Sequence, residues 1–360
     1  MPDDRILSVS QAIAEATDVC LERDERVFVI GEGVTDPKAI FGTTAGLVQK
    51  FGSDRVIEMP VAENGLTGVA IGAALLGRRP ILVHQRVEFA LLSLEQLFNN
   101  AAKTHYVTGG RHRVPLVVRL IIGRGWGQGP EHSQSAEVIF AHFPGLKVVM
   151  PSTPRQAKGL LIAAIEDDNP VVFIEHRWVH YATGHVPEGH YTEPLSGPVR
   201  VREGKDVTLV ATAYGLFETL QAADALAESG ISAEVFDMRV LRPLDVGPIV
   251  DSVRRTRRLM IVDTGWRTYG PGAEIASRIA ESCFNDLAAP PARLALADHP
   301  TPSSRALVGN FYPHAGMIID RLEAMMPDTA ERLAPAREIL AAARAETMID
   351  VPNPQFRGPF

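Results

Sequence analysis

The chain has 360 residues, of which 46% are hydrophobic, and its formal net charge is only -7. This composition suits one or two globular domains, each with its own core. No Lys/Arg run is long enough to indicate nucleic-acid binding, and no apolar run approaches the roughly 18 residues of a membrane helix. Cys20 and Cys283 form no CxxC pattern, so neither a zinc site nor a disulfide framework is indicated. A cytoplasmic location fits best.

Apolar strands alternate with helices along the first half of the chain. In chain order we expect a helix over residues 8–23, a strand over 27–30, a helix over 66–76, a strand over 80–84, a helix over 91–104, strands over 115–122 and 147–150, a helix over 155–166 and a strand over 170–175. These strands lack polar alternation, which is typical of parallel strands covered by helices on both faces. The first half is therefore predicted to be a doubly wound α/β domain.

The second half is predicted to be a smaller α/β domain. Residues 176–202 are rich in His, Gly and Pro and have no period, which indicates a connection with a boundary near residue 190. Strands are expected over 207–213, 233–238 and 258–262, with helices over 216–228 and 272–279. A further helix is expected over 330–347, before an irregular end. The predicted units are 1–190, 191–326 and a C-terminal helical extension, 327–360.

Glu63 is the most informative single residue. It lies in MPVAENGLTGVAIGAALL, a stretch of small and apolar residues that is expected to be buried. A buried carboxylate needs a specific reason, and functional sites are one such reason. The ordinary explanation is a glutamate in the first turn of a helix, where the helix dipole stabilises a negative charge. Position alone leaves both explanations open.

The glycine-rich run GRGWGQG, residues 123–129, is the nearest thing to a phosphate-binding signal. There is no Walker motif, and this run precedes PEHSQS instead of opening an amphipathic helix. We interpret it as a mobile loop and not as a dinucleotide fingerprint.

Five stretches together match a known family: GTTAGLVQKFGSDRVIEMPVAENGLTGVAIGAAL, GPEHSQSAEVIFAHFPGLKVVMPSTPRQAKGLLIAAI, NPVVFIEH, REGKDVTLVA and RVLRPLD. Over residues 5–325 the chain resembles the beta subunit of the thiamine-diphosphate-dependent 2-oxoacid dehydrogenases. The resemblance implies a pyrimidine-binding domain followed by a transketolase-like C-terminal domain. It also implies that an alpha subunit with a GDG motif holds the diphosphate and its magnesium, in an alpha2beta2 tetramer. The chain has no GDG motif with a following Asn, as this division of labour requires.

The resemblance also assigns roles to residues. Glu63 matches the glutamate that hydrogen-bonds to the aminopyrimidine of the cofactor and relays a proton, a role that burial assists because it favours the protonated carboxyl. His132 matches an active-site histidine that stabilises the intermediate and guides acyl transfer, although a lone histidine is more often structural. Phe89 and Gln85 match positions that line the cofactor, although a Phe in such a run is otherwise ordinary core. The remaining candidates, His84, His105, His112 and His142, are interpreted as structural.

Some family members hold a structural potassium ion with main-chain carbonyls. The matching positions here are Leu116, Ala164, Asp167 and Asn169, although Asp and Asn before a Pro also form an ordinary turn.

The chain departs from the family at the presumed substrate channel. Arg86 and Arg124 stand there beside Trp126, where the family has aromatic, small or compact residues. We hypothesise that Arg86 or Arg124 adds positive potential for an anionic group of the substrate beyond the usual carboxylate. The tail beyond Pro327 is also longer than in the family.

Three functions stay open. The first is a 2-oxoacid dehydrogenase component that decarboxylates a 2-oxoacid and passes the acyl group to the lipoamide of an acyltransferase. The second is a thiamine-diphosphate-dependent carboligase, transketolase-like or acyloin-forming, that works without lipoamide. The third is a non-catalytic partner subunit, although the presence of both Glu63 and His132 argues against it. Small residues at helical spacing over 65–74 suit close packing against a partner helix, and they equally suit packing within one domain.

Overall fold

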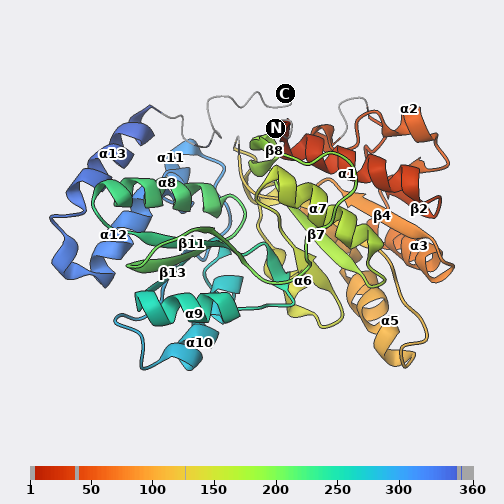
Figure 1. Cartoon of the computed structure of the whole chain (residues 1–360). Helices are drawn as coiled ribbons and strands as arrows, with labels where there is room; N and C mark the ends of the chain where they lie inside the picture. Colours follow the sequence, from red (N-terminus) through yellow and green to blue (C-terminus); the bar gives the residue numbers. More distant parts are fainter. Residues whose placement is uncertain (1–4, 37–39, 126, 347–349, 351–360) are drawn as a thin grey trace.

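The computed structural model describes residues 5–36, 40–125, 127–346 and 350, and it contains two parallel sheets that lie side by side (Figure 1). The sheet of the first half has the strand order β12-β6-β7-β5-β4-β2-β3. In chain order its strands are β2 (Val27–Gly31), β3 (Val56–Glu58), β4 (Arg79–His84), β5 (Val117–Ile122), β6 (Lys147–Val149), β7 (Val171–His176) and β12 (Val240–Arg242). Neighbours in this sheet are parallel, except that β12 runs antiparallel to β6.

Helices cover both faces of this sheet. One face carries α1 (Val9–Arg23) and α7 (Pro154–Glu166), whose buried side chains share a core with β2 and β4. Ser8 begins α1 with a capping box to Gln11, and Thr153 caps α7 through the Gln156 N–H. The other face carries α3 (Glu63–Leu75), α4 (Val87–Ala90), a π-helical segment (Gln96–Ala101), α5 (Ala102–Val107) and α6 (Glu137–His142). A short helix, α2 (Leu47–Phe51), precedes β3.

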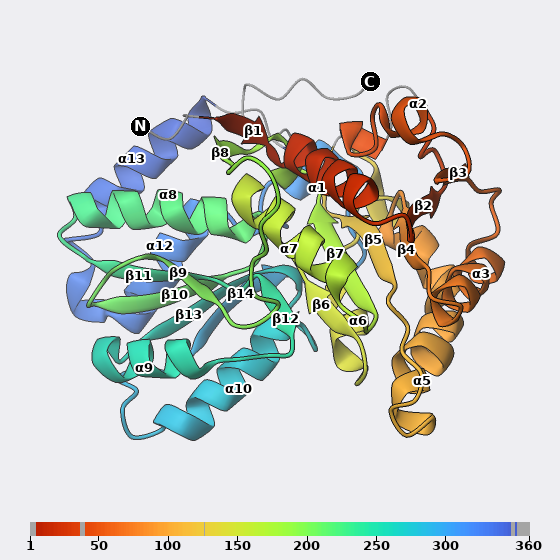
Figure 2. The same cartoon turned by 45° about the vertical axis from the view of Figure 1, so that its right-hand side comes forward.

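The sheet of the second half has the order β14-β13-β10-β11-β9. Its strands are β9 (Val199–Arg202), β10 (Val207–Ala211), β11 (Ala233–Asp237), β13 (Leu259–Trp266) and β14 (Ala292–Leu296), and β9 is antiparallel to β11. On one side lie α9 (Gly247–Thr256) and α10 (Pro271–Cys283); on the other lie α8 (Gly215–Glu228), α12 (Ala315–Met325) and α13 (Ala334–Ala345) (Figures 1 and 2). A four-residue helix, α11 (Arg305–Val308), precedes α12. A separate two-stranded sheet pairs β1 (Ile6–Ser8) with β8 (Thr183–His185).

The two halves share buried surface. One core cluster contains Phe140 and Val148 from the first half together with Ile249 and Ile275 from α9 and α10. Strand β12 belongs to the second half in sequence but extends the first sheet. The relative position of the two sheets is therefore stabilised by burial and by backbone pairing together.

The predicted doubly wound architecture is confirmed, while several local details differ. The helix expected over 91–104 begins earlier, at Val87, and includes the π-helical segment, because Val87 and Ala90 are fully buried and extend the apolar face. The expected extension 327–360 contributes α13, whose flanking Leu333 and its own Leu340 pack into the core formed with α8 and α12. Residues 347–349 and 351–360 lie outside the described residues.

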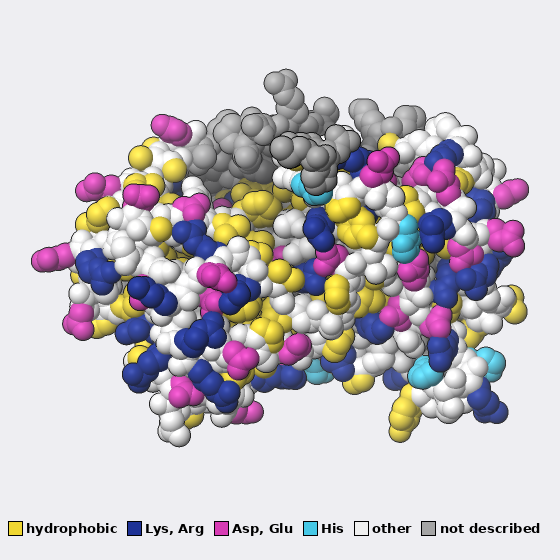
Figure 3. All heavy atoms as spheres, in the orientation of Figure 1, with side chains coloured by type: hydrophobic (Ala, Val, Ile, Leu, Met, Phe, Trp, Pro, Cys, Tyr) yellow, Lys and Arg dark blue, Asp and Glu magenta, His cyan; other side chains and the backbone are white. Residues whose placement is uncertain are grey.

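The surface carries charges of both signs. On the face drawn in Figure 3, Lys and Arg side chains are interspersed with Asp and Glu side chains. Within the described ranges, no helix combines the length and the apolar character that crossing a membrane requires.

Candidate active site

The carboxyl ends of the parallel strands gather several polar residues at one edge of the first sheet. Ligands of open α/β sheets bind at this edge. Glu32 follows β2, Gln85 follows β4, and Arg177 follows β7. The Gln85 side-chain amide donates to the main-chain oxygen of Glu32 at 3.3 Å, which ties the ends of β2 and β4 together. This edge is the candidate site.

Glu63 is the first residue of α3 and is buried, with 5% of its surface exposed. Its main-chain oxygen accepts hydrogen bonds from the hydroxyls of Thr67 at 2.7 Å and Ser93 at 3.2 Å. These bonds fix the first turn of α3 against the segment that follows β4. Burial raises the pKa of the Glu32 carboxyl, and the nearby Glu63 carboxyl raises it further. Burial and the neighbouring Glu63 carboxyl thus both favour the protonated form of Glu32.

Phe89 and His132 lie next to each other, although they are far apart in sequence. Their ring centroids are 5.7 Å apart and the rings meet edge to face at 86°. Both are half-buried, so part of each ring remains accessible. Glu88, which directly precedes Phe89 in sequence, accepts a hydrogen bond from the N–H of Gln134, two residues after His132, at 2.8 Å. Burial raises the pKa of Glu88, while the charges of Arg86 and His132 act in the opposite direction.

The glycine-rich loop places His132 by an unusual backbone path. Gly123, Gly125, Gly127 and Gly129 have φ values of 100°, 142°, 70° and 63°. This region of φ is open to glycine and strained for most other residues, which explains why every second residue is Gly. A Cβ atom at Gly123 would lie only 2.6 Å from the His176 Nε2 atom. The loop runs into a 3-10 turn, Gly129–Glu131, and His132 follows it directly.

The predicted channel residues are placed differently from one another. Arg86 is 7% exposed and lies at the same edge, directly before α4. The Arg124 guanidinium is sandwiched between Trp178 and Tyr312, at 3.8 and 4.3 Å from the ring centroids, and thereby joins the two halves of the chain. Burial lowers the pKa of Arg124. Trp126 lies outside the described residues.

The four predicted potassium positions lie at the opposite, amino-terminal end of the strands. The main-chain oxygen of Leu116 accepts the Val171 N–H at 2.9 Å, and that of Ala164 accepts the Asp167 N–H at 3.3 Å. The Asp167 oxygen accepts from Arg79 Nη1 at 3.0 Å, and the Asp167 carboxylate pairs with Lys147. The fourth, Asn169, donates its N–H to that carboxylate at 2.8 Å. The turn thus already has two cationic side chains bonded to it.

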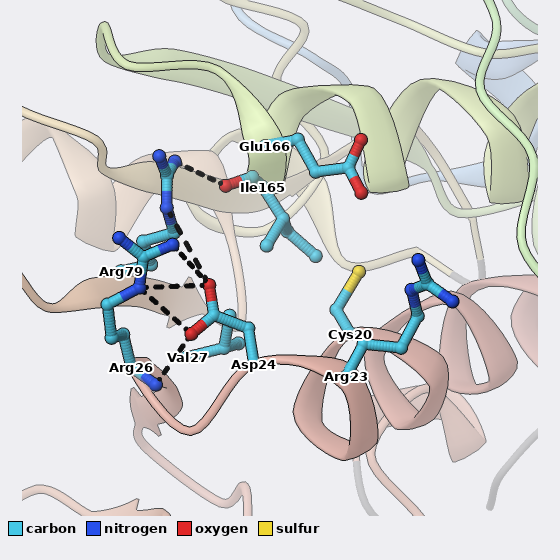
Figure 4. A pocket seen from close by; sticks show the side chains of 8 residues that line it. All are labelled: Cys20, Arg23, Asp24, Arg26, Val27, Arg79, Ile165 and Glu166. Carbon is cyan, nitrogen blue, oxygen red and sulfur yellow. Dashed lines mark hydrogen bonds and ion pairs between the residues drawn. The ribbon is translucent and has the colours of Figure 1, made fainter.

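A hollow of about 490 Å³ lies at this same amino-terminal end (Figure 4). Cys20 and Arg23 of α1 face Glu166 of α7 across it, and Arg79 bonds to the main-chain oxygen of Ile165 at 3.0 Å. Burial raises the pKa of the Cys20 thiol to about 12, so the thiol stays protonated. The hollow is therefore remote from the carboxyl edge, and its cysteine is unreactive.

Four residues of the candidate site were not predicted. Glu32 could have been found, because the GEG turn directly follows a predicted strand. Glu88 is adjacent in sequence to Phe89, but its hydrogen bond with the Gln134 N–H depends on the fold. Gln128, whose side-chain oxygen accepts hydrogen bonds from Arg86 and Arg177, belongs to the site as well. Gln128 and Arg177 carry no recognisable sequence signal, since their position depends on the order of the strands.

The comparisons with known proteins define first the class and then the family. The model of the transketolase pyrimidine-binding domain matches residues 6–179, and that of the transketolase C-terminal domain matches residues 198–318. A solved structure titled split gene transketolase, inactive beta4 tetramer, covers 89% of this chain and 98% of its own with a TM-score of 0.72. At 20% identity this likeness concerns the fold alone.

Curated relatives are closer in sequence. The pyruvate dehydrogenase E1 component subunit beta of Porphyra purpurea is 42% identical over 82% of this chain and 89% of its own. The 2-oxoisovalerate dehydrogenase subunit beta of Bacillus subtilis is 40% identical over 91% and 99%. The acetoin:2,6-dichlorophenolindophenol oxidoreductase subunit beta of Cupriavidus necator is 38% identical over 87% and 96%. The chain belongs to the family of beta subunits of thiamine-diphosphate-dependent 2-oxoacid dehydrogenases, a family of oxidoreductase components, and membership implies an alpha subunit as partner.

Proposed function

We propose that the chain, together with its alpha subunit, decarboxylates a 2-oxoacid and passes the acyl group to the lipoamide of an acyltransferase. The observation that carries the proposal is the buried Glu63 carboxyl, which lies at the ligand-binding edge of the sheet beside a second carboxyl, Glu32. Relatives named as pyruvate and 2-oxoisovalerate dehydrogenase subunits support this reaction class.

The residues at this edge suit an aminopyrimidine ring. The Glu63 carboxyl offers a hydrogen bond in a site shielded from water, where such a bond is stronger than in solvent. Phe89 offers an aromatic packing surface, and the Gln85 amide is held in place by Glu32. Thiamine diphosphate, when bound, supplies a nucleophilic carbon that accepts the electrons released as carbon dioxide leaves. In this proposal Glu63 holds and exchanges the proton of the pyrimidine ring, and Gln85 and Phe89 orient that ring.

His132 is proposed to act on the substrate side of the site. Its half-buried ring packs edge to face on Phe89, which restricts the orientation of the imidazole while leaving part of it accessible. An imidazole N–H can donate a hydrogen bond to an oxygen that gains charge during the reaction. This arrangement supports a role for His132 in stabilising the reacting group and in acyl transfer.

The diphosphate and its magnesium are proposed to bind to the alpha subunit through a GDG motif. This chain has no GDG motif followed by an Asn, which is consistent with a site divided between two subunits. Potassium binding by the carbonyls of Leu116, Ala164, Asp167 and Asn169 stays a prediction. Its support is that Ala164, Asp167 and Asn169 lie around one turn next to Leu116, and that oxygens of Asp167 already attract the cationic side chains of Arg79 and Lys147. The cytoplasmic location also stays a prediction.

An exposed face of α3 is the proposed subunit interface. Gly65, Val69, Gly72 and Leu76 recur at helical spacing along one side of this helix. Val69 and Leu76 are 58% and 87% exposed, and no neighbouring atom lies near the Cβ position of Gly65 or Gly72. An apolar stripe with small residues permits a second backbone to approach closely. Because this helix begins at Glu63, an interface here would also close the active site, as an alpha2beta2 assembly requires.

A second candidate function is supported by the names of two relatives. The subunits from Cupriavidus necator and Bacillus subtilis are named as components of acetoin:2,6-dichlorophenolindophenol oxidoreductase. An acyloin-directed enzyme would use the same carboxyl and histidine on a neutral substrate without releasing carbon dioxide. Measuring carbon dioxide release alongside dye reduction distinguishes the 2-oxoacid dehydrogenase from the acyloin-directed enzyme. A carboligase would be recognised because it would consume 2-oxoacid without reducing the dye.

The proposal is tested by Glu63→Gln in the enzyme purified with its alpha subunit. The substitution keeps the size of the side chain and removes its exchangeable carboxyl proton, so we expect kcat for dye reduction with 2-oxoacids to fall about 10²- to 10⁴-fold. The matched control is Glu25→Gln, which changes an exposed glutamate. Dye reduction by the Glu63→Gln enzyme at the rate of the Glu25→Gln enzyme would exclude the catalytic role.

A further inference from the structure

Two buried guanidinium groups meet at the edge of the candidate active site. Arg86 follows β4 and Arg177 follows β7, and these strands lie on either side of β5. They are 7% and 2% exposed. Both donate to one acceptor, the side-chain oxygen of Gln128, with Arg86 Nη2 at 2.8 Å. Both also lie over the ring of Phe41, at 5.6 and 5.2 Å from its centroid.

The position of the Arg86 guanidinium is electrostatically unfavourable without an anion. Burial lowers the pKa of Arg86 to about 10, and burial together with the charge of Arg86 lowers the pKa of Arg177 to about 9. Arg86 shares its neutral acceptor with a second buried cation, so the charge of Arg86 lacks the compensation that buried ions normally have. The other terminal nitrogen of Arg86, Nη1, has no hydrogen-bond partner among the described residues.

The acids that face this pair form no ion pair with Arg86 within the described residues. The charge of Glu88 acts on Arg86, but the hydrogen bond of the Glu88 carboxyl is to the Gln134 N–H. Tyr181 and Asp350 act on Arg177, and an Asp350 oxygen accepts the Gly127 N–H at 3.3 Å. The guanidinium of Arg86 therefore keeps a donor available for an anionic acceptor.

The pair is adjacent to the catalytic residues of the proposed function. Arg86 directly follows Gln85, and Gln128 precedes the turn that ends at His132. Glu88 lies near enough to both Arg86 and His132 for each to lower its pKa. An anion held by Arg86 would thus lie near His132.

We propose that Arg86 and Arg177 form a subsite for a second anionic group of the substrate, whose oxygens displace the Gln128 amide oxygen. This inference rests on the proposed function and specifies its substrate class: 2-oxoacids that carry a further carboxylate or phosphate. An anionic oxygen is a stronger acceptor than an amide for a guanidinium, whose planar fork matches carboxylate and phosphate geometry.

The test compares matched substrates on the enzyme purified with its alpha subunit. One pair is 2-oxoglutarate against 2-oxopentanoate, which has the same chain length without the second carboxylate. The other is phosphohydroxypyruvate against hydroxypyruvate. We expect kcat/KM to be at least about tenfold higher for the doubly anionic member of one pair, since a hydrogen bond to a charged group is worth about 1.5–3 kcal/mol. The substrate pair with the larger ratio of kcat/KM shows whether the subsite prefers a carboxylate or a phosphate.

Variants test the residues. In Arg86→Ala the ratio within the preferred pair is expected to fall about 10- to 100-fold, mostly through KM. Gln128→Glu places a carboxylate between the guanidiniums. This carboxylate should compete with the second anionic group of the substrate for the same position, so the variant should also lose the preference for the doubly anionic substrate. Arg86→Lys should keep part of the preference. The matched control is Arg78→Gln, an exposed arginine before the other end of β4, which should leave the ratio unchanged.

Three results would overturn the inference. If the wild-type enzyme uses the singly anionic members at least as well, no anionic subsite exists, although the proposed function stands. If Arg86→Ala lowers kcat/KM of both members by the same factor and Gln128→Glu keeps the wild-type ratio, Arg86 only positions the glycine-rich loop. If no 2-oxoacid is turned over at all, the proposed function fails and the substrate class fails with it.

Discussion

A buried pair of carboxyl groups crosses the junction between the two halves of the chain. Glu137 is the first residue of α6, and Asp263 lies in β13. They are 0% and 2% exposed. Asp263 accepts the N–H groups of Gly265 at 3.1 Å and Gly272 at 3.0 Å, whereas neither oxygen of Glu137 accepts a hydrogen bond from a described residue. Glu137 is therefore the member that retains a proton and shares it with Asp263.

The pH dependence follows from the pKa of Glu137. Burial and then the negative charge of Asp263 raise this pKa from 4.5 to about 8. Because the folded pKa is the higher one, the unfolded chain releases this proton first as the pH rises. The contribution of Glu137 to stability is thus complete below pH 4.5 and is lost as the pH rises toward 8. Between pH 6 and 8 the loss is about 2–3 kcal/mol, at about 1.4 kcal/mol per pH unit.

We predict that Glu137→Gln removes this loss, because glutamine keeps the shape and can still donate to Asp263. The free energy of unfolding, measured by urea with tryptophan fluorescence, should decrease less steeply with pH in the variant. Relative to wild type, the variant should gain about 2–3 kcal/mol between pH 6 and 8. The control is Asp237→Asn. Burial raises the pKa of Asp237 only to about 6, so the difference in unfolding free energy between this variant and wild type should stop changing with pH by about pH 7. A constant difference between Glu137→Gln and wild type from pH 6 to 8 would refute the proton-sharing argument.

Two further predictions concern stability. Arg119 is fully buried and its Nε lies 2.7 Å from Glu175; burial opposes ionisation of Glu175, but Arg119 and His180 outweigh it and lower the pKa to about 2. Glu175→Gln should therefore lower the free energy of urea unfolding at pH 7 by about 3–5 kcal/mol, and a loss below 1 kcal/mol would contradict the role of this ion pair. On α13, Leu340→Ala, at 5% exposure, should destabilise by about 2–4 kcal/mol, whereas Ile339→Ala, at 44%, should cost under about 1 kcal/mol. Equal effects would mean that α13 is not part of the second core.

The sequence by itself determined the alternation of buried strands and helices and the motif positions. Each buried strand is continuous and apolar, so its type can be predicted from its own residues. The sequence also predicted Glu63, Phe89 and His132 as site residues, and the contact between Phe89 and His132 is present in the structure. Short edge strands such as β3 and β12 were missed because three residues carry too little periodicity.

Only the tertiary structure decided which distant side chains meet. The order of β4, β5 and β7 brings Arg86, Gln128 and Arg177 together, and the packing of α6 on β13 brings Glu137 to Asp263. Arg86 and Arg124 looked equivalent in the sequence, yet Arg124 is enclosed by aromatic rings of both halves. The physical reason is that local periodicity reports which face of an element is buried, whereas the pairing of charges depends on long-range strand order and on how the two sheets pack.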